Sequence, residues 1–386
     1  MTTAPSTDAG EAATRLAAEL IALDTTNPGL VTGAPGERAA VDHLRSRLDR
    51  AGFTTHVITP DEHPGRPSLV AYPSDSEGLP TAILNGHLDT VGPGAMLEPF
   101  SPRVVADRMH GRGSADMKAG IAALVVAAER VAAAGSVRPV LALVADEEDA
   151  SVGSESVIAA LPALGVDPEV CLIAEPTDLA LARTVRGFAV IRVSIEGRAA
   201  HSSQPELGTN AVSRLGRLIA AVDEQAQRIR AAGGDLMVTV ARGGESPFVV
   251  PAAAECIVER RVAPGEALTE VVTEVQSLLR PDWDATIEVL AQREPWRCDS
   301  AGPARRWGDA LADGLGTGWD LDAPYWLEAP LWQRVCPTVV CGPSGGGLHS
   351  DDEWVDLAQL RAFTRVLIDT LGRPARLSGT ARDHAD

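Results

Sequence analysis

The chain has 386 residues, which exceeds the usual limit for one hydrophobic core, so we expect two domains. Its formal net charge of -19 argues against nucleic-acid binding, because the phosphate backbone attracts basic surfaces. No apolar run is long enough to span a membrane. The N-terminus has neither the basic nor the apolar region of a signal peptide, and the five scattered cysteines suit a reducing compartment. We therefore expect a cytoplasmic protein that binds neither nucleic acid nor membrane.

In the first part of the chain, short aliphatic strands alternate with helical patterns. The predicted strands lie at 54–57, 68–71, 81–84, 140–145 and 170–174, and the predicted helices at 9–22, 37–51 and 117–134. Strands that alternate with helices predict a parallel or mixed α/β sheet. In such sheets, the chemistry gathers beyond the carboxyl ends of the strands.

A second pattern occupies the region from residue 185 to residue 294. It predicts strands at 188–196, 236–241, 254–261 and 286–291, and helices at 210–232 and 268–279. This β-α-β-β-α-β order is typical of a small ferredoxin-like domain. We therefore interpret the region as an inserted domain.

The last part of the chain resumes the first pattern. It has predicted helices at 304–316 and 357–371, with a strand at 338–341 between them. The sequence thus predicts a discontinuous catalytic domain of residues 1–184 and 295–386, interrupted by a domain of residues 185–294. The tail after about residue 375 is polar, and we expect it to be disordered.

Four consecutive acids, Asp146 to Asp149, follow the predicted strand at 140–145. Adjacent carboxylates at the end of a buried strand repel one another and are costly to desolvate, so we expect a cation to compensate them. A metal ion is the obvious candidate. A solvated acidic loop explains this segment alone equally well.

Other residues that commonly bind metal ions also stand at or just beyond the ends of predicted elements. Together with two members of the acidic run they form a set of seven candidates: His87, Asp89, Asp116, Glu147, Glu148, Glu175 and His349. Imidazole nitrogens combined with carboxylate oxygens suit zinc, cobalt or manganese. The number of acids favours two ions that share a bridging carboxylate over one tetrahedral ion. In the pair His87 and Asp89, the acid could hold the second nitrogen of the imidazole.

Five motifs contain these candidates in order along the chain. They are His87-Leu-Asp89-Thr-Val, Gly111-Arg-Gly-Ser-Ala-Asp116-Met-Lys-Ala-Gly120, Asp146-Glu147-Glu148, Glu175-Pro-Thr177 and His349-Ser-Asp-Asp-Glu353. Together they resemble the co-catalytic zinc aminoacylase and carboxypeptidase family, which includes acetylornithine deacetylase, succinyl-diaminopimelate desuccinylase and glutamate carboxypeptidase. The resemblance extends from about residue 10 to residue 372. It implies a zinc-peptidase-like α/β catalytic domain with a mixed sheet, interrupted by a ferredoxin-like α+β lid and dimerisation domain.

The resemblance implies a role for each candidate ligand. Asp116 would bridge two zinc ions, for which Co2+ or Mn2+ could substitute. His87 and Glu175 would complete one site, and Glu148 and His349 would complete the other. The implied cofactor is therefore a pair of Zn2+ ions.

The resemblance also implies catalytic and substrate-binding residues. Glu147 would be the general base that takes a proton from a metal-bridging water, and Asp89 would orient the histidine two residues before it. His201 resembles a lid histidine that stabilises an oxyanion in the active site of a second subunit, which implies a homodimer. Asn210 belongs to the same lid motif and is a substrate-binding candidate. Arg261 would hold the substrate carboxylate through a bidentate contact, although a surface salt bridge also explains an arginine here.

Two positions depart from the family pattern. Phe248 stands where an asparagine that contacts substrate is common, and Leu327-Glu328-Ala329 replaces the usual Thr-Asp-Ala. An apolar ring in place of an amide would suit a different or bulkier acyl group, so Phe248 is also a substrate-binding candidate. The implied ligands are intact, and the departures therefore bear on the substrate.

The implied activity is that of a metal-dependent amide hydrolase that removes an acetyl or succinyl type of N-acyl group from an amino acid. A metallo-carboxypeptidase or dipeptidase that releases a C-terminal amino acid is the main alternative, because both reactions hydrolyse an amide beside a carboxylate. In either case the partner is a small molecule, an N-acyl amino acid or a short peptide.

Two other classes of protein stay open as alternatives. The segment Gly342-Pro-Ser344-Gly-Gly346 fits the G-x-S-x-G motif of serine hydrolases, but no predicted helix follows it. A non-catalytic binding protein could share the scaffold, although such a protein would be expected to have lost the base or a ligand. Sensitivity to a metal chelator distinguishes the first alternative, and metal-dependent turnover excludes the second.

Overall fold

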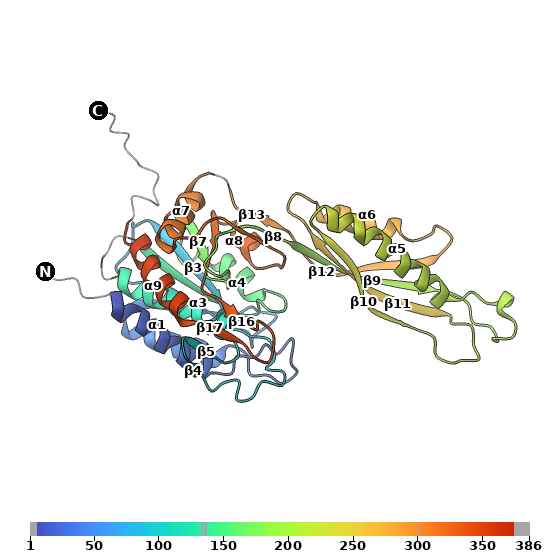
Figure 1. The fold of residues 1–386 in the computed structure, drawn as a ribbon, viewed down its shortest axis with the longest axis horizontal. Coiled ribbons are helices and arrows are strands. Elements are labelled where there is room, and N and C mark those ends of the chain that lie inside the picture. The colour runs from blue at the N-terminus through green and yellow to red at the C-terminus, as the bar shows by residue number, and fades with distance from the viewer. Residues whose placement is uncertain (1–5, 133, 135–136, 300, 374–386) are drawn as a thin grey trace, which may run out of the picture. The chain divides into compact units, whose positions relative to one another are not determined.

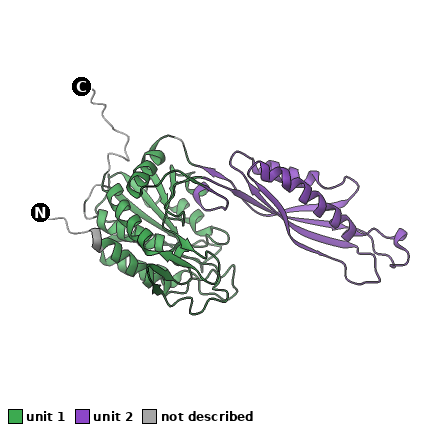
Figure 2. Ribbon diagram, in the orientation of Figure 1, with its two compact units in different colours: residues 1–183, 298–321, 331–386 green, residues 184–297, 322–330 purple. Residues whose placement is uncertain are grey.

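The computed structural model describes residues 6–132, 134, 137–299 and 301–373 (Figure 1). The tail that we expect to be disordered lies outside these residues from residue 374 onward. The chain forms two compact units (Figure 2). Unit 1 contains Met1–Arg183, Cys298–Leu321 and Leu331–Asp386, and unit 2 contains Thr184–Arg297 and Asp322–Pro330. Within the described ranges, no helix combines the length and the apolar character needed to cross a membrane.

Unit 1 is built on a six-stranded sheet with the order β1-β2-β6-β3-β7-β15. Its strands are β1 (Phe53–Ile58), β2 (Ser68–Pro73), β3 (Thr81–His87), β6 (Arg138–Val144), β7 (Val170–Ile173) and β15 (Thr338–Val340). Strands β6, β3, β7 and β15 are mutually parallel, whereas β2 runs antiparallel to both β1 and β6. This mixed sheet confirms the predicted α/β class.

The helices of unit 1 pack on this sheet and on one another. They are α1 (Ser6–Ile21), α2 (Arg38–Arg50), α3 (Ala119–Ala132), α4 (Val152–Ala160), α7 (Pro303–Leu315), α9 (Leu357–Leu371) and the short α8 (Ala329–Trp332), which begins in unit 2. The apolar α3 is buried because α1 and α9 cover the side that faces away from β3 and β6. A Cβ atom on Gly120 would lie 2.3 Å from the carbonyl oxygen of Ala174, so only glycine lets α3 begin this close to the end of β7.

A second, antiparallel sheet of unit 1 joins two distant parts of the chain. Its order is β16-β17-β5-β4, with β4 (Arg103–Val105), β5 (Arg108–His110), β16 (Gly345–Gly346) and β17 (Trp354–Asp356). These short strands carry no local pattern that would predict them. Their pairing brings the loop after β5 next to the segment that precedes β17.

Unit 2 contains the predicted β-α-β-β-α-β order. Its elements are β9 (Gly187–Glu196), the one-turn η2 (Pro205–Leu207), α5 (Ala211–Ala231), β10 (Asp235–Gly243), β11 (Ala253–Val262), α6 (Leu268–Ser277) and β12 (Asp284–Arg293). The sheet order is β10-β11-β9-β12, and every neighbouring pair is antiparallel. Alternate residues of β9 and β11 are buried, as expected for a sheet that is covered by helices on one face.

The boundary between the units differs from the predicted one. Residues 322–330, which the sequence left in the catalytic domain, belong to unit 2. They do so because β14 (Leu321–Ala323) joins β8 (Ala182–Val185) and β13 (Trp296–Arg297) in a three-stranded sheet. In addition, Trp326 packs edge-on against Phe188, with ring centroids 5.9 Å apart. Pairing between strands this far apart leaves no local signal in the sequence.

Candidate metal centre

Four parallel strands of unit 1 end at the same edge of the sheet, and the candidate ligands lie at or beyond their ends. His87 is the last residue of β3, Glu147 and Glu148 follow β6, and Glu175 follows β7. His349 follows β15 after a longer, glycine-rich loop. Parallel strands present their carboxyl ends together, so residues far apart in the sequence meet there.

Asp116 lies between two histidines. Its Oδ1 is 3.0 Å from Nε2 of His87, and its Oδ2 is 3.3 Å from Nε2 of His349. The same nitrogen of His349 is 3.1 Å from Oε2 of Glu148, and Nε2 of His87 is 3.9 Å from Oε1 of Glu175. Each oxygen of this carboxylate faces a different histidine, which is the arrangement expected of a ligand that bridges two metal ions.

Two sets of side chains bring their ligand atoms close enough to hold a metal ion. One set is His87, Asp116 and Glu148, and the other is His87, Glu147 and Glu175; within each set the atoms lie within 4.8 Å of one another. The second set includes Glu147, to which the family resemblance gives the role of a base. Its carboxylate is therefore near enough to the centre for either role.

The acids of the centre raise the pKa values of its histidines. Burial disfavours the charged ring of His87, but the hydrogen bond to Asp116 and the charge of Glu175 outweigh it and raise the pKa well above its usual range. Hydrogen bonds to Asp116 and Glu148 raise the pKa of His349 to about 10. Burial opposes ionisation of Asp116, yet both histidines hold the pKa of that carboxyl below its usual range. The cluster thus strongly favours positive charge at this point.

The surroundings of a buried oxygen of Glu148 indicate whether the cluster fits a metal ion. Its Oε1 is shielded from solvent and has no hydrogen-bond partner among the residues that the structure describes. A buried carboxylate oxygen without a partner is unfavourable, and a bound cation would satisfy it. Burial and the charge of Asp116 also raise the pKa of Glu148, so this carboxylate would gain from a nearby positive ion. Oxygen and imidazole donors of this kind fit Zn2+, Co2+ or Mn2+.

Asp89 contacts His87 most closely through its backbone. Nδ1 of His87 lies 3.0 Å from the carbonyl oxygen of Asp89 and 3.7 Å from its carboxylate Oδ1. The carboxylate of Asp89 instead accepts hydrogen bonds from the backbone amides of Glu147 (3.1 Å) and Glu148 (3.2 Å). The carbonyl of Asp89 is thus the nearer partner of the imidazole and its carboxylate the more distant one, and the side chain also holds the turn that carries the two glutamates.

Glu353 is a site residue to which the sequence analysis assigned no role. Its carboxylate accepts hydrogen bonds from the backbone amides of Gly113 (2.9 Å), Ala115 (2.9 Å) and Asp116 (3.1 Å). The guanidinium of Arg112 donates a further bond of 2.6 Å to the same carboxylate, and both side chains are 1% exposed. Glu353 therefore fixes the backbone that presents the bridging candidate.

The predicted helix at 117–134 begins two residues later in the structure. Residues Ser114–Lys118 form an irregular turn in which Asp116 (φ -117°, ψ 93°) is extended, and the regular helix starts at Ala119. The only sequence signal for this arrangement is that Glu353 lies four residues after a candidate ligand, within the same motif.

We expect Glu353→Gln to destabilise unit 1 by about 3 to 5 kcal/mol, because it leaves the buried charge of Arg112 without its partner. The amide nitrogen would also face backbone N–H groups that need an acceptor. Urea unfolding of the purified variant measures this loss. The control is Asp352→Asn, an exposed neighbour, and a loss for Glu353→Gln no larger than that of the control would contradict the assignment.

His201 lies on an exposed loop of unit 2. The backbone amide of Ser203 donates a hydrogen bond of 3.2 Å to its Nδ1, and the Ser203 hydroxyl lies 2.8 Å from the same atom. Since an amide can only donate, Nδ1 acts as an acceptor and the neutral ring carries its proton on Nε2. That nitrogen is therefore a hydrogen-bond donor.

The other candidates of unit 2 have local contacts of their own. The side chain of Asn210 caps α5 by accepting a bond of 2.9 Å from the amide of Ser213. Phe248 is 70% exposed, and its carbonyl accepts a bond from the loop that carries His201. Arg261 pairs with Glu259 and lies 5.8 Å from the ring centroid of Phe188. His201 and Phe248 thus lie on neighbouring segments of unit 2.

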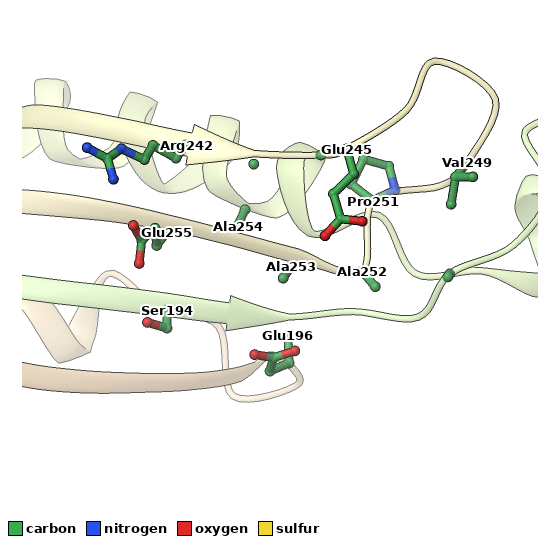
Figure 3. Close-up of a pocket in the computed structure, with 13 residues that line it drawn as sticks. Ser194, Glu196, Arg242, Glu245, Val249, Pro251, Ala252, Ala253, Ala254 and Glu255 are labelled. Carbon is green, nitrogen blue, oxygen red and sulfur yellow. The ribbon is translucent and has the colours of Figure 1, made fainter.

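A pocket of about 400 Å3 lies on unit 2 beside the loop that leads to Val249 (Figure 3). It lies where β9, β10 and β11 meet this loop, and its charged lining side chains are Glu196, Arg242, Glu245 and Glu255. None of the candidate metal ligands is among its lining residues in the described part of the chain. The pocket therefore does not mark the metal centre.

The serine-hydrolase alternative is not supported by the surroundings of Ser344. The residues that follow it form β16, which pairs antiparallel with β17. The nucleophile of a serine hydrolase elbow stands between a strand and a helix. That context is missing here.

Histidines and carboxylates converge at one end of the mixed α/β sheet. One carboxylate is shared between two histidines, and another acid lies beside it. This arrangement is that of a metal-dependent hydrolase. Comparison with known proteins identifies the family. The profile of "Peptidase family M20/M25/M40" matches residues 83–373, and the chain belongs to this family of metallohydrolases. This confirms the resemblance that the five motifs indicate.

Named relatives and a solved structure agree with this assignment. An acetylornithine deacetylase of Vibrio vulnificus is 28% identical over 361 residues, which cover 88% of this chain and 92% of that protein. A succinyl-diaminopimelate desuccinylase of Zymomonas mobilis is 25% identical over 365 residues, covering 91% and 95%. The structure of a tripeptidase from Staphylococcus aureus superposes with a TM-score of 0.80 at 17% identity, covering 95% and 99% of the two chains, and it shows the shared fold.

Proposed function

We propose that this metallohydrolase removes an acetyl or succinyl type of N-acyl group from an amino acid. The observation that carries the proposal is the carboxylate of Asp116, which faces His87 and His349 with one oxygen each. The carboxylate of Glu147 lies beside the same centre. The names of the two sequence relatives, a deacetylase and a desuccinylase of amino acids, support an N-acyl amino acid as the substrate.

The proposed cofactor is a pair of Zn2+ ions, with Co2+ or Mn2+ as substitutes. Asp116 would be shared by both ions, His87 and Glu175 would hold one, and Glu148 and His349 would hold the other. When bound, the ions would polarise the amide carbonyl and lower the pKa of water. The unsatisfied oxygen of Glu148 and the carboxylate shared between two histidines support this arrangement.

In the proposed reaction, Glu147 is the general base. Its carboxylate takes a proton from water as the water oxygen attacks the acyl carbon. It then gives this proton to the amide nitrogen as the carbon–nitrogen bond breaks, so one water is consumed and a carboxylate and a protonated amine are released, the second proton of the water passing from the new carboxyl group to the amine. Nε2 of His201 would donate a hydrogen bond to the acyl oxygen as it gains negative charge. Arg261 would pair with the carboxylate of the amino acid.

Unit 2 alone cannot place His201 and Arg261 on one substrate. The register of β11 with β9 pairs Ala253 with Glu196 at one end and Arg261 with Phe188 at the other, and His201 lies beyond the first end. The eight residue steps from Ala253 to Arg261 span roughly 26 Å of extended strand. An acyl amino acid is much shorter than this. We therefore propose a homodimer in which His201 serves the active site of the partner subunit.

A cytoplasmic location is part of the same proposal. All five cysteines are free, and four of them are buried. Free thiols are typical of proteins in reducing compartments. Fractionation of cells that produce the protein, followed by detection with an antibody, measures the location.

A hydrolysis screen tests the proposed function. N-acetyl and N-succinyl derivatives of several amino acids are compared with dipeptides in the presence of zinc or cobalt, with a parallel arm that contains a chelator. We expect turnover of acyl amino acids that the chelator abolishes. Faster turnover of dipeptides would favour the carboxypeptidase or dipeptidase alternative. Turnover that resists complete metal removal would contradict the metal centre.

Phe248→Asn is expected to change the preference between acyl groups. Replacing an exposed apolar ring with an amide removes an apolar surface and adds hydrogen-bonding groups. Changes of this kind in a binding site alter the ratio of kcat/KM between two substrates by about tenfold or more. Competition between acetyl and succinyl derivatives of one amino acid measures the ratio. Leu207→Asn, another exposed apolar position of unit 2, is the control, and an unchanged ratio in Phe248→Asn refutes the assignment.

A further inference from the structure

A buried arginine lies next to the acidic turn of the metal centre. Arg66 precedes β2, and its side chain is 9% exposed. A buried guanidinium requires compensating charges, because its transfer from water is costly. Neither the family motifs nor the proposed ligand set includes this residue.

The guanidinium of Arg66 contacts several buried polar side chains. Its Nε lies 3.0 and 3.1 Å from the two carboxylate oxygens of Glu37. Its NH1 donates to a carboxylate oxygen of Asp146 and, over 3.1 Å, to Oδ1 of Asn27. Its NH2 lies 3.9 Å from Oδ2 of Asp89. The side chains of these partners are at most 3% exposed, so the contacts are shielded from solvent.

Asn27 links the same groups a second time. Its amide nitrogen donates bonds of 2.8 Å to Oδ2 of Asp89 and 3.1 Å to Oδ1 of Asp146. Its amide oxygen accepts bonds from Arg66 (3.1 Å) and from the backbone amide of Gly29 (2.8 Å), and these two donors together fix the orientation of the amide. The carboxylate of Asp89 is therefore held from one side by Asn27 and Arg66.

The other side of Asp89 holds the residues that do the proposed chemistry. As described above, its two carboxylate oxygens accept the backbone amides of Glu147 and Glu148. Asp146, the residue just before them, has a left-handed backbone (φ 70°) and contacts Arg66 directly. The turn that presents both glutamates is thus bonded at its first three residues to a network that converges on one guanidinium.

We infer that Arg66 is a positioning residue, which orients Glu147 and Glu148 at the metal centre through Asp89, Asn27 and Asp146. The inference rests on the proposed function. It also assigns a different counter-charge to each of two members of the acidic run. Arg66 compensates the charge of Asp146, and a metal ion would compensate the charge of Glu148. Because this counter-charge is part of the fold, the turn is held in place before any metal is bound.

The test compares Arg66→Met with the unmodified enzyme in two measurements. The first is the affinity of the metal-free protein for Co2+, followed by visible absorbance. The second is kcat and KM of the metal-loaded enzyme for the best substrate of the screen. Loss of a residue that orients metal ligands lowers metal affinity or activity by about 10- to 100-fold. We expect a loss of this size in Co2+ affinity and in kcat, with little change in KM.

The matched control is Arg47→Met. Arg47 makes a comparable forked pair with Glu129, at 2.7 and 2.9 Å, but it joins α2 to α3 and has no contact with the acidic turn. We expect the control to lose stability while its Co2+ affinity and kcat stay unchanged. If Arg66→Met behaves like the control in both measurements, Arg66 is only structural and the inference is overturned.

Arg66→Lys is a second variant, which tests the inference if Arg66→Met does not fold. A lysine keeps the charge but cannot make the forked contacts of a guanidinium. We expect this variant to fold and to lose Co2+ affinity and kcat, and unchanged values overturn the inference. If the unmodified enzyme hydrolyses no acyl amino acid, the proposed function fails, whereas the Co2+ titrations still support or overturn the role of Arg66.

Discussion

Glu147→Gln is expected to retain its metal ions and to lose nearly all turnover. The substitution keeps the shape of the side chain but removes the carboxylate that accepts a proton. General acid–base catalysis contributes about 100- to 10,000-fold to a rate, so kcat should fall by a factor in this range. Substrate binding should change little, because the variant keeps the proposed ligands of the ions and Arg261. Steady-state kinetics with parallel metal analysis by mass spectrometry measure both quantities.

The acidic run supplies a control for this experiment. Asp149 is the exposed member of the run, and Asp149→Asn removes one carboxylate from the same turn. We expect this variant to keep its kcat. Normal turnover in Glu147→Gln with full metal content would refute the role of the base. A loss of turnover that accompanies a loss of metal would instead make Glu147 a ligand, as its distance from His87 and Glu175 permits.

The second large effect is expected for Asp116→Asn. An asparagine leaves one oxygen acceptor and no charge where the carboxylate faces His87 and His349. We expect binding of the second ion to weaken by at least about 100-fold, the upper end of the losses seen when an outer partner of a ligand is removed. Titration of metal-free protein with Co2+ should then give one ion per chain instead of two. Asp107→Asn, at an exposed carboxylate of unit 1, should leave the stoichiometry at two.

A shared ligand also has a consequence for thermal stability. Ions that bind only the folded protein stabilise it in proportion to the logarithm of their concentration over Kd. The unmodified chain should therefore gain a larger rise in Tm from added zinc than Asp116→Asn does. Equal stoichiometry and equal shifts in the two proteins would show that Asp116 does not join two ions.

Much of the fold could be predicted because its strands and helices carry strong local patterns. The strand at 140–145 is a short aliphatic run, and the predicted helix at 357–371 has the same bounds in the structure. The β-α-β-β-α-β order of unit 2 followed from the change of pattern after residue 185. The pairing of residues 322–330 with unit 2 was not predicted, and neither were the short strands β4, β5, β8, β13, β14, β16 and β17 or the helices α4 and α8. These elements are short or are stabilised by distant partners.

The gathering of the candidate ligands was predictable to the extent that these residues stand at the ends of strands. His87, Glu148 and Glu175 illustrate this, since each ends or follows a strand of one parallel set. The residues that hold them could not be predicted in the same way. Arg66 and Glu353 act through contacts with residues about 80 and 240 positions away, and their own surroundings in the sequence look like ordinary loops.

The bond between the Gly113 amide and Glu353 joins residues 240 positions apart, so it can form only after most of the chain has been synthesised. On the ribosome, the strands that carry His87 and Glu175 emerge first, and unit 2 is synthesised before His349 and Glu353 appear. Contacts this distant in sequence form late and slow the folding of the parts that depend on them. His349, a proposed metal ligand, and Glu353 would therefore be absent from the nascent chain until nearly all of it has been translated, so the proposed pair of metal sites could be completed only late in biosynthesis.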